Sequence, residues 1–243
     1  MDISIFSDHG ALLFRYFHIV GGVAWIGVLW YINFIQGGYV GGLDAAGQTI
    51  AKQKLFPKVM WYFRYGALLT FITGLGLIAL KGFGPGKVGG QIGSDVWNAW
   101  FAKIYPGFMF ATIMFLNVWF VIWPRQKKVI AAANGEKIDG VPAMARRGFI
   151  ASRTNTLLSI PMLFFMAAAN NLIISGISAD KLNLWIIITS VVFILIEANA
   201  LFASNDPAAK PVTVKPIETV KGVIHMGFVL TILLYVGVEL ILK

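Results

Sequence analysis

Apolar residues along this chain fall in long blocks, and do not follow the 3.6- or 2-residue period of a water-soluble domain. Each block approaches the length of about 20 residues that crosses a bilayer as an α-helix. The pattern therefore predicts an all-α fold, a polytopic membrane bundle of about six transmembrane helices that forms one integral membrane domain over residues 1–243. The expected spans are 11–35, 60–81, 101–123, 155–176, 182–203 and 219–241.

Composition agrees with a bilayer as the surroundings of this chain. Hydrophobic residues make up 58% of the sequence and charged residues 13%, and the mean hydropathy is +0.75. These values are typical of an integral membrane protein. The first block does not have the pattern of a cleavable signal peptide, because no basic region precedes it and no small-residue cleavage site follows before Trp30 and Tyr31.

Positive charge is distributed unevenly among the connections, which predicts an orientation. Lysine and arginine are retained on the cytoplasmic side of a membrane. We therefore expect both termini outside, in the inner (cytoplasmic) membrane of a bacterium, with a short amphipathic helix between Arg125 and Arg153. The connections after the first, third and fifth helices are basic, with Lys52, Lys54, Lys58, Arg125, Lys127, Lys128, Lys137, Arg146, Arg147, Arg153, Lys210, Lys215 and Lys221, whereas the others carry Lys81, Lys87 and Lys181.

The formal net charge of +9 thus reflects topology, and no nucleic-acid partner is expected because no basic module with interleaved aromatic residues is present. The sequence contains no cysteine, which excludes a disulfide, an iron–sulfur cluster, a thiolate metal site and covalently attached c-type haem. Redox chemistry would need a histidine-ligated haem, a metal held by histidine and oxygen, a quinone or a partner subunit.

Polar side chains inside membrane helices are costly and often functional, and His18 is the most informative of them here. Gly22 lies one turn beyond His18 and Trp25 lies two turns beyond, so the three share one helix face. Glycine on this face lets either a neighbouring helix or a flat macrocycle approach the backbone. His18 is therefore either a hydrogen-bonded histidine in a helix contact or a haem or metal ligand, and in both cases it should point into the bundle.

Glu197 and His225 should lie at one level of the hairpin formed by the last two helices. They form either a hydrogen-bonded pair that fixes the register of the hairpin, or a site in which His225 binds a metal or haem iron and Glu197 accepts its other N–H. His18 and His225 are expected roughly 10 Å apart along the membrane normal. A shared iron and a site with His18 alone both stay open.

Four further polar residues are expected around these candidate ligands. Asn170 and Asn171 should lie in the same membrane layer as His18, where hydrogen bonding between helices is the alternative role. Arg15 is placed near the outer boundary of the first helix, and Arg64 lies within the second.

Several blocks together resemble a known family. The segments "FHIVGGVAWIGVLWYINFIQ", "LFPKVMWYFRYGALLTFITGLGLI", "NVWFVIWPRQKKVIAAANG" and "RTNTLLSIPMLFFMAAANN" are similar to the membrane domain of bacterial urate hydroxylases, the urate oxidase N-terminal domain family, over about residues 11–176. The first segment also resembles the copper-resistance D family and the membrane-bound protoporphyrinogen oxidases, which bind b-type haem. The resemblance implies a membrane oxidoreductase that binds non-covalent b-type haem through His18, with His225 as a possible second ligand, and passes electrons to a separate cytochrome c or a quinone.

The chain also departs from the family pattern. Urate hydroxylases usually end in a cytochrome c domain with a CxxCH motif, so the resemblance implies a stand-alone form without it. Where the family has a His-Trp pair, this chain has Met60 before Trp61, and where the family has His-Asn it has Thr154 before Asn155. The two missing imidazoles favour a second function, that of a non-catalytic accessory or scaffold subunit in a larger membrane complex.

Overall fold

The computed structural model describes residues 3–84, 91–209 and 211–243. Lys87 and Lys210, which contribute to the predicted orientation, lie outside the described residues. Within this part of the chain all regular structure is helical, and the expected six membrane helices are confirmed. The helices long and apolar enough to cross a membrane are His9–Gly41, Ala45–Phe83, Asp95–Ala133, Val141–Asn171, Ala179–Phe202 and Val220–Leu242.

The first three spans are each built from several helical segments. The first contains α1 (Ile3–Trp30), a π-helical segment (Tyr31–Gln36) and α2 (Gly37–Gly41). The second contains α3 (Ala45–Ile50), a π-helical segment (Ala51–Leu55), α4 (Phe56–Ile78) and a second π-helical segment (Ala79–Phe83). The third contains α5 (Asp95–Leu116), a π-helical segment (Asn117–Ile122) and α6 (Trp123–Ala133).

The last three spans are simpler. They are α7 (Val141–Asn171), α8 (Ala179–Phe202) and α10 (Val220–Gly237), which ends in a π-helical segment (Val238–Leu242), with the short α9 (Lys215–Glu218) before α10. Side-chain oxygens of Ser178 and Thr219 cap α8 and α10 by accepting a hydrogen bond from the amide three residues later. Such caps satisfy backbone donors that have no partner within the helix.

The structure corrects the connection that we expected between Arg125 and Arg153, because most of these residues belong to helices. No separate amphipathic helix forms there, because α6 continues to Ala133 and α7 begins at Val141. The chain turns between them through Gly135 and Gly140, whose φ angles of 97° and 70° suit glycine. Most of the basic residues of this region therefore lie on membrane helices, where Arg146 and Arg147 of α7 find carbonyl and carboxylate partners.

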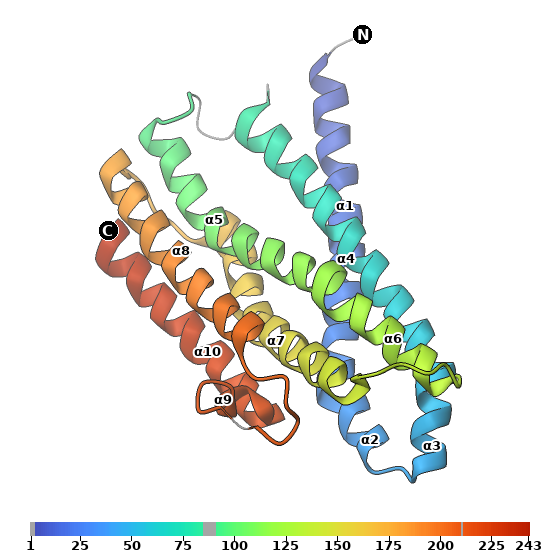
Figure 1. Ribbon diagram of the computed structural model, residues 1–243. Helices are drawn as coiled ribbons and strands as arrows, with labels where there is room; N and C mark the ends of the chain where they lie inside the picture. The colour runs from blue at the N-terminus through green and yellow to red at the C-terminus, as the bar shows by residue number, and fades with distance from the viewer. Residues whose placement is uncertain (1–2, 85–90, 210) are drawn as a thin grey trace.

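α7 is the centre of the bundle (Figure 1). The apolar stretch of α7 is 72% buried inside the protein, against 22% for the first, second, fifth and sixth spans. α5 and α10 pack along α7, and α1 packs along α4. We call the side of the two chain ends the terminal side, and the side of the α6–α7 and α8–α9 connections the basic side. Which of the two faces the cytoplasm stays a prediction.

Prolines inside α5 and α7 create contacts between helices. Pro106 has no N–H to give to the carbonyl of Ala102, and the indole Nε1 of Trp185 on α8 donates to that carbonyl at 2.9 Å. Pro161 likewise leaves the carbonyl of Leu157 free. A Cβ atom on Gly227 of α10 would lie 3.1 Å from that oxygen, so α10 approaches it closely. The indole of Trp185 thus replaces the missing donor at Ala102, and α10 packs closely against the carbonyl of Leu157.

Candidate functional site

The contact between α1 and α4 places the His18 site. Gly66, Thr70 and Gly74 recur every four residues along α4 and form a stripe of small residues. A Cβ atom on Gly66 would lie 2.9 Å from the backbone nitrogen of Trp25, and one on Gly74 would lie 2.9 Å from Cε1 of His18. The two helices therefore touch nearly backbone to backbone, and the imidazole fits over a glycine.

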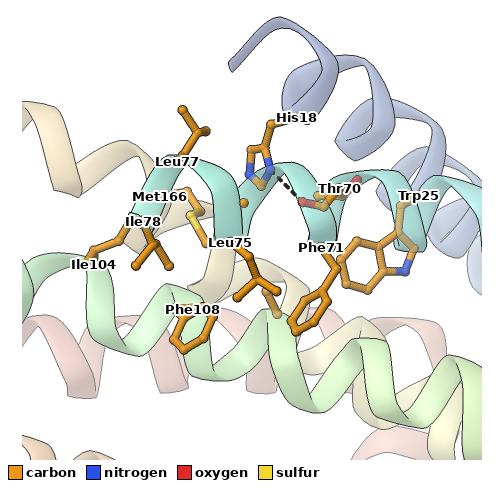
Figure 2. Close-up of a pocket in the computed structure, with 12 residues that line it drawn as sticks. His18, Trp25, Thr70, Phe71, Leu75, Leu77, Ile78, Ile104, Phe108 and Met166 are labelled. Atoms are coloured by element: carbon orange, nitrogen blue, oxygen red, sulfur yellow. Dashed lines mark hydrogen bonds between the residues drawn. The ribbon is translucent and has the colours of Figure 1, made fainter. Parts of the chain in front are cut away.

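His18 points into the bundle and forms a defined hydrogen bond (Figure 2). Its Nδ1 lies 2.8 Å from the backbone carbonyl oxygen of Thr70. Because a carbonyl can only accept, Nδ1 carries the proton and Nε2 keeps its lone pair. Within the described residues Nε2 has no hydrogen-bond partner. Imidazoles that bind metals are commonly oriented in this way, with the other ring nitrogen donating to a carbonyl.

Two mainly apolar cavities border His18. The larger has a volume of about 460 Å³ and is lined by His18, Gly22, Trp25 and Met166, among others. The smaller, of about 70 Å³, is the one drawn in Figure 2, where Met166 approaches from α7. The larger volume lies in the range of cavities that hold small-molecule ligands and cofactors.

The two adjacent glycines of α1 have different surroundings. A Cβ atom on Gly21 would lie 2.8 Å from Oγ1 of Thr70, so Gly21 is required for the contact with α4. A Cβ atom on Gly22 would come no closer than 4.0 Å to its nearest neighbour, Cγ2 of Thr70, and Gly22 lines the larger cavity. Gly21 thus serves helix packing, whereas Gly22 leaves space for a ligand.

Cations lie on the terminal side of the His18 cavities. Arg15, Lys81 and Asn170 line a cavity of about 280 Å³ together with His18. Lys81, Lys103 and Asn170 also line an adjoining cavity of about 320 Å³. Lys103 donates to the carbonyl of Leu172, and no described carboxylate pairs with any of the three cations. The arrangement suits a ligand that is apolar at one end and carries acidic groups at the other.

The structure does not bring His18 and His225 together. His225 lies exposed on α10, a helix that packs against α7, and lines none of the five cavities described for this protein. The expected hydrogen bond between Glu197 and His225 does not form. Glu197 instead accepts a hydrogen bond from Nδ2 of Asn117 at 3.0 Å. The same amide group donates to Asn155, so Glu197 belongs to a polar network inside the bundle. Glu197 therefore bonds to Asn117 inside the bundle and not to the exposed imidazole of His225.

The remaining predicted residues separate into two groups. Arg15 and Asn170 share a cavity with His18. Asn171 is exposed and donates to the carbonyl of Ala167 in its own helix. Arg64 lies away from these cavities, with its guanidinium carbon 3.6 Å from the ring centroid of Trp123, a cation–π contact.

Thr70, Lys81 and Met166 were not anticipated as part of this site. The spacing of Gly66, Thr70 and Gly74 could have indicated the helix contact that brings Thr70 to His18. Lys81 was expected at the very end of the second span, 60–81, and was counted with the connection that follows, whereas the second membrane helix continues to Phe83. No sequence signal pairs Met166 with α1.

The comparison with known families now adds to this geometry. The model of the family described as urate oxidase N-terminal matches residues 92–232, which is more than half of the chain. The chain belongs to the urate oxidase N-terminal family. The match extends beyond the expected limit at residue 176 and includes Glu197 and His225, whereas α1 with His18 precedes it. No curated protein and no solved structure matches the sequence.

Proposed function

We propose that this member of the urate oxidase N-terminal family is a membrane redox protein of the urate hydroxylase type, which binds non-covalent b-type haem at His18. The observation that carries the proposal is the hydrogen bond from Nδ1 of His18 to the carbonyl of Thr70. This bond fixes the tautomer and leaves the Nε2 lone pair available to iron beside a cavity of about 460 Å³.

The residues around His18 fit such a group. Gly22 leaves room on the cavity wall, and Trp25 and Met166 supply an apolar lining. Arg15 and Lys81 would pair with the propionate carboxylates, since both line the adjoining cavity. Met166 reaches all three cavities that His18 lines, and its thioether is a known type of haem ligand.

Bound haem would supply one-electron transfer. The part of the protein is then to hold the iron through His18, to exclude water with the apolar lining and to neutralise the carboxylates. A separate cytochrome c, a quinone or another membrane subunit would exchange the electrons.

A second candidate function is that of an accessory or scaffold subunit without a cofactor. One observation favours it: where urate hydroxylases have histidines, Met60 and Thr154 are buried in the packed interior, at 4% and 2% exposure. At those two positions the side chains of Met60 and Thr154 thus contribute to packing and cannot act as imidazole ligands.

The visible spectrum of the purified protein separates the two functions. We expect a Soret band and an α band that appear on reduction, with about one haem per chain by extraction. His18→Ala should lower the haem content at least tenfold while His225→Ala, on an exposed residue, leaves it unchanged. A colourless preparation that still assembles with other subunits would reject the redox function, and equal loss in both variants would reject His18 as the ligand.

A further inference from the structure

A further cavity, apart from the four near His18, lies on the basic side of the bundle. It has a volume of about 140 Å³ and is enclosed by the first membrane helix, α4, α6 and α7. Unlike the two mainly apolar cavities that border His18, it has several polar groups in its lining, and none of the described residues that line it is acidic. The polar members are Asn33, Gln36, Gln126, Ser152 and Arg153.

Arg153 is the unusual member of this set. It is 7% exposed, and its Nε and Nη1 have no hydrogen-bond partner among the described residues. The other arginines on α7 have partners for their charge: Arg146 pairs with Glu218 at 2.5 Å, although its buried Nε is unpaired, and Arg147 donates to the carbonyls of Ala200 and Ala203. Arg153 thus carries a buried positive charge without a counter-charge.

The aromatic neighbour of Arg153 stabilises its positive charge only in part. The guanidinium carbon lies 5.1 Å from the ring centroid of Phe149, which is a cation–π distance. That contact satisfies none of the N–H groups. A buried cation with unpaired donors is strongly unfavourable, and at membrane depth such residues mark ligand sites by default.

The amide groups in the cavity are also incompletely bonded. Gln36 is 4% exposed, and its Oε1 has no partner, nor does the buried Oε1 of Gln126. The oxygen and nitrogen of a glutamine amide are assigned from their surroundings and can be exchanged, so each amide can donate or accept towards a bound molecule. Asn33 is already engaged, because its Nδ2 donates to Leu29 and Ser152.

From these observations we infer that the cavity at Arg153 binds a small carboxylate anion. Nε and Nη1 of Arg153 lie on different edges of the planar guanidinium, and on either edge a carboxylate can accept from the unpaired nitrogen together with Nη2. The volume of 140 Å³ is below the range of drug-sized ligands and restricts the anion to a small one. This site is independent of haem, and its ligand neutralises the buried charge of Arg153.

Thermal unfolding of the purified full-length protein tests the site, with sodium acetate as the probe against sodium chloride at equal ionic strength. Ligands that bind only the folded state raise its stability by mass action. At a hundredfold excess over the dissociation constant, acetate should raise the Tm by about 5 °C or more. The exposed Lys128→Met is the matched control and should respond as the wild type does.

Two substitutions connect the effect to the cavity. Arg153→Met removes the charge with little change in volume, and should abolish the acetate response without lowering the Tm in chloride. Gln36→Glu places a carboxylate inside the cavity, and should raise the Tm in chloride and also remove the response. An equal Tm of the wild type in both salts, as for a cavity filled by water alone, would overturn the proposal. So would an acetate response that persists in Arg153→Met.

Discussion

Two pairs of helices in this bundle come together by opposite means. α1 and α4 approach through Gly66, where the absence of a side chain lets the backbones touch, and through Gly74, which leaves room for the ring of His18. α5 and α8 meet where Pro106 removes a backbone donor and Trp185 supplies a replacement. The first contact depends on shape over several turns, and the second depends on one hydrogen bond. Substitutions in the contact between α1 and α4 should therefore destabilise the protein more than substitutions in the contact between α5 and α8.

Gly66→Ala should have the largest effect on stability. The added Cβ atom would lie 2.9 Å from the backbone nitrogen of Trp25, and a backbone atom can yield only if α1 and α4 move apart. We expect a loss of ~2–3 kcal/mol, or roughly 5–10 °C in the Tm measured in detergent. Gly22→Ala is the control and should change the Tm little, because its Cβ atom meets nothing closer than 4.0 Å. Similar losses in both variants would show that the contact does not depend on close approach.

Trp185→Phe tests the proline contact. The substitution leaves the carbonyl of Ala102 without a donor, at a cost of ~1–2 kcal/mol in thermal unfolding. Pro106→Ala restores an N–H within α5, so in the double variant the loss of the indole donor should cost less than it does alone. A double-mutant cycle measures this coupling. Strictly additive effects would mean that the hydrogen bond contributes nothing.

Asn155→Leu removes the side-chain hydrogen bonds of Asn155 and should have the smallest effect of the three on the stability of the protein. Asn155 is fully buried, accepts from Asn117 and donates to the carbonyl of Met114 at 2.9 Å. Hydrogen bonds between membrane helices contribute ~0.6 kcal/mol each on average, so the loss of these two should cost ~1 kcal/mol and lower the Tm by a few degrees. Asn171→Leu serves as the reference, since Asn171 is exposed and bonds only within α7. If the reference variant loses as much, the buried amide is not special.

Much of the fold was predictable because hydrophobic length alone determines which segments can cross a bilayer. The six spans follow from that rule, and no tertiary information is needed to find them. The ends of the helices were harder to predict. Arg147 and Arg153 were assigned to a loop, whereas both are buried in α7. A loop and a buried helix turn with arginines look alike in hydropathy, and only the carbonyl partners of Arg147 distinguish them.

The candidate site was predictable in part. The stripe of His18, Gly22 and Trp25 is a property of one helix, and periodicity reveals it. The partners of these residues come from α4 and α7, and their identity depends on how helices far apart in sequence pack. Glu197 shows the limit, because its level on the hairpin pointed to His225 while the packing of the third membrane helix supplied Asn117. Site residues that depend on long-range packing therefore stayed out of reach.

The freed proline carbonyls have a consequence for the order of assembly. α5 is synthesised before α8, so a newly inserted α5 lacks the indole partner of its Ala102 carbonyl until Trp185 arrives. The carbonyl of Leu157 in α7 waits in the same way for the approach of α10 at Gly227. The last helices to leave the ribosome thus cover backbone groups of earlier ones. Insertion of the early helices can precede their final packing, which becomes complete only when the C-terminal helices have joined the bundle.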